Sequence, residues 1–213
     1  MYIKKKNLFL ITALFFTFTM LFTAEVSAQA RPSISIEPSE TTIGVGDEFT
    51  VSITAADWEE PGVFSYELYL YYNTTYLNAT GAEIPSDHWL KPTESPYNIF
   101  IVDGGTINNT EGVASFAATL LAPELGKTGG GILAQVTFTV IQGPSTGEIT
   151  SYLELEDSIL VDPNAVQIPP ENYDVNPASV IIPEFSAIAM LIALFTITAT
   201  IILLKTKRNS LKL

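Results

Sequence analysis

A two-residue hydrophobic alternation, repeated along the middle of the chain, constrains the fold more than any other feature. In "EFTVSITAA" (48–56), every second residue from Phe49 to Ala55 is apolar, and the residues between them are Glu, Thr or Ser. The same period runs through 63–72, 113–121 and 132–141. Successive side chains of a strand point to opposite faces, so each segment reads as a half-buried β-strand. No window between 31 and 182 keeps helical spacing for three turns.

Shorter strand patterns occur at 33–37, 98–102, 149–155 and 179–182, with Gly, Pro, Asn and Asp between the segments. About nine strands separated by such turns predict an all-β fold, an antiparallel two-sheet jelly-roll sandwich. The residues expected in its core are Val51, Ile53, Phe64, Leu68, Val136 and Phe138.

The N-terminal thirty residues have the layout of a targeting segment. Lys4–Lys6 precede an apolar run at 8–22, and "VSAQA" places Ala28 and Ala30 before a cleavage point. This pattern predicts a secretory signal peptide over 1–30. The alternative is a permanent membrane helix, which is disfavoured because the run has only 15 residues and a spanning helix needs about 20.

The C-terminus predicts a membrane anchor. Residues 186–204 are 19 consecutive residues without a charge, long enough to cross a hydrocarbon core of about 30 Å. The basic tail 205–213 is then expected in the cytoplasm, because positive flanks stay inside. The domain at 31–182 would lie outside the cell, attached by a single transmembrane helix.

The charge of this outer domain limits its partners. Between Arg31 and Ile182, 21 acidic residues face three basic ones, a net charge of −18. Such a surface repels phosphate backbones, which excludes nucleic acid, while basic protein surfaces, cations and neutral sugars remain possible. The chain also has no cysteine, which removes disulfides, zinc–thiolate sites and thiol nucleophiles.

Three Asn-x-Thr sequons lie within the outer domain, at Asn73, Asn78 and Asn108. Outside the cell they are candidate glycosylation sites. The first two follow an aromatic strand, so we expect them on a loop at the end of that strand.

Little in the sequence predicts catalysis or a cofactor. His88 is the only histidine, and no second histidine, cysteine or nucleophile motif accompanies it, so we expect no enzyme activity. Calcium is the one candidate cofactor, because Asp103, Asn108, Asn109 and Glu111 in "DGGTINNTEG" offer oxygen ligands. Their spacing is not that of an EF-hand.

Two tyrosines form the candidate binding site. Tyr69 and Tyr71 alternate with Leu68 and Leu70, so they point outward if the leucines are core. Exposed tyrosine offers a rigid amphipathic contact to a protein partner or a sugar ring. The alternative is that a loop covers them.

The order of these motifs resembles a cohesin domain, the module that receives dockerins in cellulosomes. The resemblance spans nearly all of 33–182 and rests on "VGDEFTVSITA", "FSYELYLYYNTTYL", "GGGILAQVTFTVI" and "ITSYLELEDSILVD". It implies a β-sandwich whose partner-binding sheet includes the strand of Tyr69 and Tyr71. Carbohydrate-binding jelly rolls share much of this pattern, and fold alone does not settle function.

The C-terminal segment is similar to the PEF-type sorting signals of archaeal surface proteins. Pro183, Glu184 and Phe185 (183–185) match the motif, followed by the apolar helix and the basic tail. The resemblance implies processing by a membrane transpeptidase; the alternative is a plain stop-transfer helix.

Two functions follow. The first is a non-catalytic, surface-anchored module that binds a protein partner, such as a dockerin-like module, through a sheet face. The second is a polysaccharide-binding or surface-coat glycoprotein domain. A planar row of exposed aromatics would favour sugar, and a flat face of mixed apolar and polar residues would favour protein.

Overall fold

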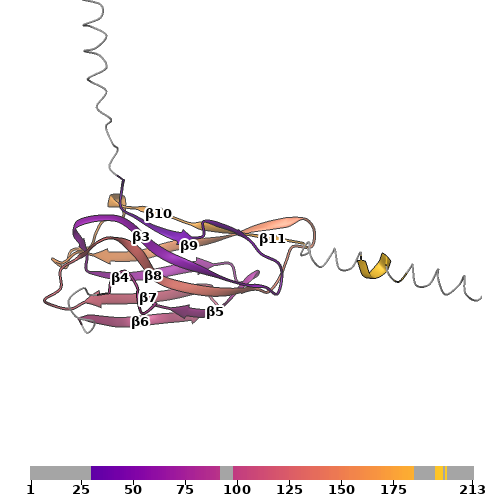
Figure 1. The fold of residues 1–213 in the computed structure, drawn as a ribbon, viewed down its shortest axis with the longest axis horizontal. Coiled ribbons are helices and arrows are strands. Elements are labelled where there is room, and N and C mark those ends of the chain that lie inside the picture. The colour runs from indigo at the N-terminus through magenta and orange to yellow at the C-terminus, as the bar shows by residue number, and fades with distance from the viewer. Residues whose placement is uncertain (1–29, 92–97, 185–194, 199, 201–213) are drawn as a thin grey trace, which may run out of the picture. The chain divides into compact units, whose positions relative to one another are not determined.

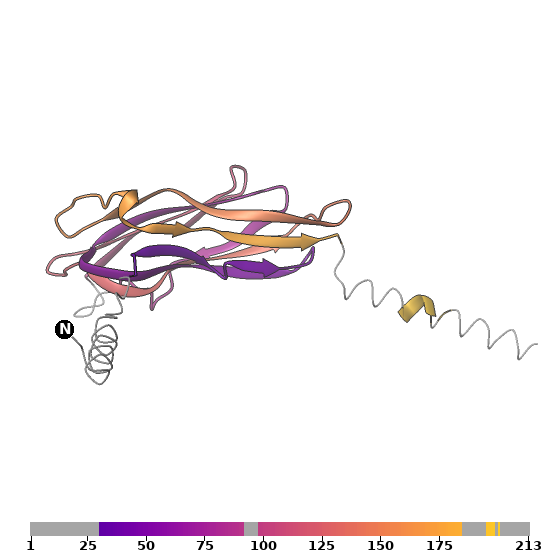
Figure 2. The same cartoon turned by 90° about the horizontal axis from the view of Figure 1, so that it is seen from above.

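The fold is that of a computed structural model, which describes residues 30–91, 98–184, 195–198 and 200. Residues 31–91 and 98–184 form two facing β-sheets (Figures 1 and 2). Residues 195–198 and 200 are helical, and within the described residues no helix is long and apolar enough to cross a membrane. The expected signal peptide up to residue 29, Phe185, most of 186–204 and the tail 205–213 lie outside the described residues.

Sheet A has five strands and sheet B has six. In spatial order, sheet A contains β10 (Asp174–Asn176), β1 (Ser33–Glu37), β3 (Glu48–Val63), β8 (Lys127–Val140) and β5 (Leu77–Glu83). Sheet B contains β2 (Glu40–Thr42), β11 (Ala178–Pro183), β9 (Glu148–Val161), β4 (Ser65–Tyr72), β7 (Val113–Leu120) and β6 (Ile99–Asn108). A short 3₁₀ turn, η1 (Pro170–Asn172), precedes β10.

The two-sheet sandwich confirms the predicted fold class, and β1 has the predicted bounds. The described chain has eleven strands rather than about nine, because β2, β5 and β10 were missed. Two short pairs, β1 with β10 and β2 with β11, are parallel, so the sheets are not wholly antiparallel as expected. Strands of three residues carry too little alternation to be found, and β5 is interrupted by a register shift between Ala79 and Gly81.

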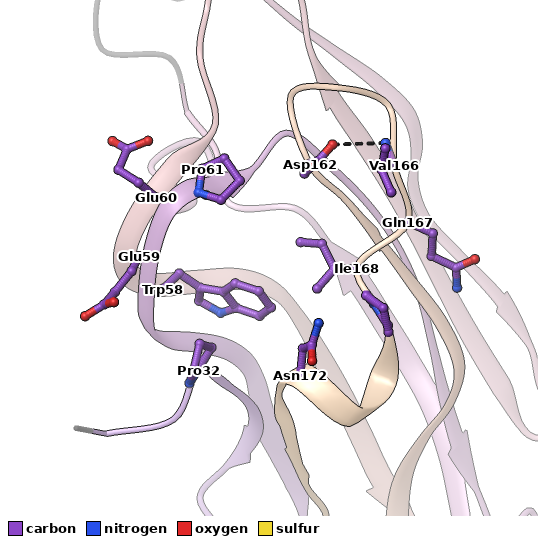
Figure 3. A pocket seen from close by; sticks show the side chains of 12 residues that line it. Pro32, Trp58, Glu59, Glu60, Pro61, Asp162, Val166, Gln167, Ile168 and Asn172 are labelled. Atoms are coloured by element: carbon purple, nitrogen blue, oxygen red, sulfur yellow. Dashed lines mark hydrogen bonds between the residues drawn. The ribbon is translucent and has the colours of Figure 1, made fainter. Parts of the chain in front are cut away.

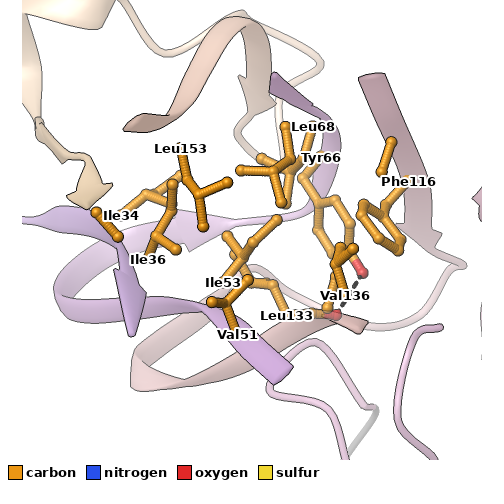
Figure 4. Close-up of a cluster of buried hydrophobic side chains, with 14 of the residues drawn as sticks. Ile34, Ile36, Val51, Ile53, Tyr66, Leu68, Phe116, Leu133, Val136 and Leu153 are labelled. Carbon is orange, nitrogen blue, oxygen red and sulfur yellow. Dashed lines mark hydrogen bonds between the residues drawn. The ribbon is translucent and has the colours of Figure 1, made fainter. Parts of the chain in front are cut away.

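The core lies between the two sheets (Figure 4). Five of the six residues expected there are buried: Val51, Ile53, Leu68, Val136 and Phe138. Phe64 is the exception; it precedes β4 and is half-buried against the cluster. Tyr66 also enters the core, where its hydroxyl donates a hydrogen bond of 3.2 Å to the carbonyl of Leu133. Burial raises the pKa of this tyrosine well above its ordinary value.

Candidate functional site

The outward side of sheet B, here called the sheet B face, carries aromatic and acidic side chains in adjacent strands. The register places Tyr69 of β4 opposite Glu156 of β9, and Tyr71 opposite Glu154. Residues directly opposite each other on one face of a sheet lie within contact range. Tyr152, two residues before Glu154 on β9, is 60% exposed. Tyrosines and carboxylates therefore alternate across two neighbouring strands.

Tyr69 and Tyr71 are partly exposed, and Leu68 and Leu70 between them are fully buried. The two tyrosines therefore point outward, as predicted. Whether they recognise a partner stays a prediction. The hydroxyl of Tyr69 donates a hydrogen bond to Oε1 of Glu67, and this bond, with some desolvation, raises the pKa of Tyr69. The Glu67 carboxylate thereby holds the Tyr69 ring in one orientation on the sheet B face.

The sheet B face also has a shallow hollow of about 230 Å³. Ala117 of β7 contributes to its lining, and a methyl side chain leaves space that a larger residue would fill. Apolar side chains border it, with Val102 from β6 and Ile159 from β9. At the edge of the sheet, Phe100 and Val102 are 58% and 63% exposed. The face is therefore mixed: apolar toward β6, and aromatic and acidic toward β9.

The charge on this face has one sign. The six strands of sheet B contain no Lys, Arg or His, whereas Glu67, Glu154 and Glu156 lie on the exposed side of β4 and β9. A surface of this kind attracts a basic partner and steers its approach.

The outward side of sheet A differs in character. Its side chains are mostly Ser, Thr, Gln and Asn, and they bond to one another across strands. Thr50 and Thr137 share a hydrogen bond of 2.9 Å, and Gln135 donates one of 3.0 Å to Ser52. Cross-strand pairs of this kind stabilise a sheet but leave fewer groups for a partner. The sheet B face is therefore the better candidate for recognition.

The three sequons lie near one end of the sandwich, but not all on loops. Asn73 is exposed in the β4–β5 turn, where its Oδ1 accepts a hydrogen bond of 2.9 Å from the Thr75 amide. Asn78 lies on β5 itself, facing outward between Leu77 and Ala79. The expectation that both follow the strand on a loop was wrong for Asn78, because a tight turn at 73–76 starts the next strand at Leu77. Glycosylation stays a prediction.

Asn108 is the last residue of β6, and its Nδ2 donates a hydrogen bond of 2.8 Å to Glu111. The adjacent Asn109 was considered from the sequence only as an oxygen ligand for calcium, yet it joins the two sheets. Its Oδ1 accepts hydrogen bonds from the Tyr72 hydroxyl (2.7 Å) and the Ala79 amide (2.9 Å). Its Nδ2 donates to the Ala79 carbonyl at 3.0 Å. In the sequence, Asn109 is the middle residue of a sequon and a possible oxygen ligand, and neither feature indicates a bridge between sheets.

The candidate calcium ligands do not meet at one point, and the side chain of Asn109 is bonded to Tyr72 and Ala79. Asp103 accepts hydrogen bonds from the Gly105 amide and from the hydroxyls of Thr106 and Ser115. Burial is the largest single influence on the pKa of Asp103 and raises it, but the hydrogen bonds together outweigh burial and lower the pKa. Asn108 and Glu111 bond to each other instead. Five residues of strand span roughly 16 Å, too far for Asp103 and Asn108 to share an ion. Within the described residues, no group of three His, Asp or Glu side chains could hold a metal.

His88 lies in the connection between β5 and β6 and is buried, with no hydrogen-bond partner for its Nδ1. Desolvation, followed by the nearby charge of Lys91, lowers the pKa of His88. A buried neutral imidazole in a loop is a packing residue rather than a general base.

The PEF residues begin inside the sheet. Pro183 is the last residue of β11 and pairs with Glu148. The Glu184 amide donates a hydrogen bond of 2.6 Å to the Gly147 carbonyl, and its Oε2 accepts one of 3.0 Å from the Gly147 amide. Phe185 lies outside the described residues, so the sorting signal stays a prediction.

A match to the cohesin-domain family model covers residues 33–176. The match spans most of the chain, so the chain belongs to the cohesin family. Cohesin domains are non-catalytic protein-interaction modules that bind dockerins, which agrees with the expectation of no enzyme activity. Among curated protein sequences, none matches this chain.

Solved cohesin structures share the fold. The cohesin of OlpC from Clostridium thermocellum, in complex with a dockerin, has a TM-score of 0.54 at 17% identity, covering 74% of this chain and 96% of that one. A type II cohesin from the cellulosome of Acetivibrio cellulolyticus has a TM-score of 0.54 at 21% identity, with coverages of 71% and 95%. A non-cellulosomal cohesin from the hyperthermophilic archaeon Archaeoglobus fulgidus has 0.52 at 14%, with coverages of 72% and 91%.

Proposed function

We propose that this chain is a cell-surface receptor module that binds a dockerin-like protein through the sheet B face. The observation that carries the proposal is the composition of that face. Tyr69, Tyr71 and Tyr152 are interleaved with carboxylates, and the apolar hollow lies beside them. Protein partners fit a mixed face of this kind, with tyrosines as anchors and charged residues at the rim.

The polysaccharide alternative is less well supported. Sugar-binding platforms need aromatic faces in a row that stacks on successive rings, and here glutamates lie directly opposite both Tyr69 and Tyr71. The test of the partner therefore includes polysaccharide as a competing outcome.

The surface location belongs to the proposal as well. The signal-like segment 1–30, the uncharged stretch 186–204 and the basic tail 205–213 together favour export with a single C-terminal anchor. The PEF residues favour later processing of that anchor by a transpeptidase. The chain leaves the sandwich at β11, so the domain would lie close to the bilayer with almost no stalk.

Binding can be tested with the full-length chain in mild detergent against a panel of dockerin modules and cell-surface polysaccharides. The informative variant reverses two charges on the sheet B face, Glu154→Lys with Glu156→Lys. The matched control reverses two on sheet A strands, Glu37→Lys with Glu83→Lys. We expect the first pair to abolish retention of the protein partner and the second to leave it intact. Retention of polysaccharide alone, or equal loss in both variants, would overturn the proposal.

Export and anchoring can be tested by intact-mass analysis of the native protein. Cleavage should leave a mature N-terminus near Gln29 or Arg31, and any added sugar should map to the three sequons. A C-terminal epitope tag distinguishes the two anchors. Sorting removes the tag from surface-exposed protein, whereas a plain transmembrane anchor keeps it. An uncleaved N-terminus would contradict the signal peptide.

A further inference from the structure

The three sequons differ in whether the nitrogen that would carry a glycan is free. Nδ2 of Asn108 donates to Glu111, and its Oδ1 accepts hydrogen bonds from the amides of Thr110 (3.1 Å) and Glu111 (3.2 Å). Asn73 is exposed, and its Oδ1 accepts a hydrogen bond of 2.9 Å from the Thr75 amide. Its Nδ2 bonds to no residue that the structure describes. Asn73 is therefore a better acceptor than Asn108.

The Asn78 acceptor is held within a strand. Asn78 pairs with Thr139 of β8 and is only partly exposed. The hydroxyl of Thr80, the third residue of this sequon, donates a hydrogen bond of 3.3 Å to the Thr137 carbonyl. The folded sheet thus engages both ends of the Asn78 sequon, and Asn73 is the most accessible of the three acceptors.

Asn73 also borders a hollow of about 310 Å³ at one end of the sheet B face. Tyr71 and Tyr152 line the hollow together with Asn73. Side chains alternate along the chain, so Tyr71 and Asn73 lie on the side opposite the buried Tyr72. The last pair in the register of β4 with β9 is Tyr72 with Leu153. One further step along both strands brings Tyr152 beside Asn73.

The lining of this hollow suits one sugar ring. Each tyrosine offers an apolar ring with a polar tip, and the C–H face of a sugar packs against such a ring. Thr150 and Glu154 also line the hollow and offer oxygen atoms to sugar hydroxyls. A free polysaccharide needs a row of aromatic rings, but a sugar bonded to Asn73 needs only one contact. Its tether keeps it beside the hollow at a millimolar effective concentration.

We propose that Asn73 carries an N-linked glycan whose first sugar packs in this hollow against Tyr71 and Tyr152. The donor is a lipid phosphate-linked oligosaccharide. The anomeric carbon of its first sugar forms a bond to Nδ2, the bond from that carbon to the phosphate oxygen breaks, Nδ2 releases a proton, and the lipid phosphate leaves. The inference rests on the proposed export of the domain. Because the packed sugar covers Tyr71, glycan occupancy lowers the affinity of the sheet B face for a protein partner.

Occupancy is tested on the native protein by mass spectrometry of its peptides. We expect a glycan on Asn73, and a lower occupancy of Asn78 and Asn108. A mature chain that has lost its signal segment but has an unmodified Asn73 would overturn the inference and leave the proposed export standing. An uncleaved N-terminus would overturn the proposed export, and the inference with it.

Packing of the sugar is tested on the full-length chain made in a eukaryotic secretory host. Thr80→Ala with Thr110→Ala leaves Asn73 as the single acceptor, and an endoglycosidase trims its glycan to one N-acetylglucosamine. The same sequence from a host without N-glycosylation is the sugar-free reference. We expect the sugar to raise the Tm by about 2–4 °C. Its ring protons should shift upfield in the nuclear magnetic resonance spectrum, as protons over an aromatic ring do.

Variants of Tyr71 identify the contact. Tyr71→Phe keeps the aromatic ring and should keep both effects, whereas Tyr71→Ala should remove at least half of the Tm gain and of the upfield shift. The matched control keeps only the Asn108 acceptor, through Thr75→Ala with Thr80→Ala. In this control Tyr71→Ala should leave the effect of the sugar unchanged. A Tm gain that is equal in Tyr71→Ala and Tyr71→Phe, or no upfield shift of the sugar protons, would overturn the packing.

The effect on the partner is measured separately, with the dockerin panel and the trimmed and sugar-free chains. We expect the trimmed chain to bind the protein partner less tightly. Equal affinity of the two chains would overturn the effect of the glycan on binding. Failure of both chains to retain any protein partner would contradict the proposed function, while the Tm and the sugar protons still decide the packing.

Discussion

The hydroxyl of Tyr72 donates a 2.7 Å hydrogen bond to Oδ1 of Asn109, and this contact helps to join the two sheets at one end of the sandwich. Tyr72 ends β4 in sheet B, and the same Asn109 side chain pairs with both backbone groups of Ala79 on β5 in sheet A. The turn that carries Asn109 closes at Gly112, whose φ of +72° favours glycine. One amide side chain thus satisfies three polar groups that belong to two sheets.

Replacing Asn109 by alanine should lower the free energy of unfolding by about 1–3 kcal/mol, because it leaves these polar groups without partners. Urea unfolding of the full-length chain measures the change. Tyr72→Phe removes only the hydroxyl and should cost about 1 kcal/mol. A loss for Asn109→Ala no larger than that for Tyr72→Phe would contradict the bridging role.

Phe138→Ala should lower the free energy of unfolding by about 3–5 kcal/mol, through lost burial and the cavity left behind. Phe138 is fully buried and packs edge-on against Tyr72, with ring centroids 5.0 Å apart. The neighbouring Thr137 faces outward on the same strand, so Thr137→Ala should cost less than about 1 kcal/mol. Similar losses in the two variants would show that Phe138 is not a core residue.

Replacing Tyr69 and Tyr71 together by alanine should weaken binding of the protein partner by at least about 2 kcal/mol if both are anchors. Thermal stability should change little, because both side chains are partly exposed. Calorimetry measures both quantities on the same samples. Partner affinity equal to that of the unmodified chain would remove these residues from the binding site.

Acidification should destabilise the fold through His88. Burial and the charge of Lys91 lower its pKa in the folded state, while Asp87 opposes them. The unfolded chain therefore binds a proton first as the pH falls through about 6.5. The stability contributed by neutral His88 is fully present above this pH and is lost below it, until the lowered folded pKa is reached. Urea midpoints between pH 7.5 and about 5.5 should fall for the natural chain and stay flatter for His88→Asn. Parallel curves would assign the slope to other groups.

The long strands of this domain were predictable because one face of each is buried and the other is wet. Because of that contrast, apolar and polar residues alternate with a period of two in the sequences of β3, β4, β7 and β8. The bends in the strands have no such sequence pattern. For example, β3 continues past Ala56 through Trp58 to Val63, and two register shifts against β8 occur in this part of the strand. A cavity of about 380 Å³ forms beside Trp58, where this bend meets the β9–η1 connection from a distant part of the chain (Figure 3). No local sequence pattern reveals it.

The outward direction of Tyr69 and Tyr71 was predictable, because successive side chains of a strand alternate between its two faces. The neighbours that define the sheet B face were not, because Glu154 and Glu156 come from a strand about 85 residues later, and their register depends on a bulge in β9 opposite Leu68. The role of Asn109 was hidden for a related reason: an amide that bonds three groups in two sheets has no signature of its own in a single sequence.

The pairing of β11 has a mechanical consequence. This strand leads directly to the C-terminal segment proposed as the anchor, and it lies between β9 and β2 within sheet B. It is in register with β9 over six residue pairs, from Ala178 to Pro183. A pull on a partner held at the sheet B face, against a tether at the C-terminus, acts along β11 and loads these pairs in shear. Their hydrogen bonds then resist the force together instead of opening one after another, so the attachment point is a strand that withstands tension.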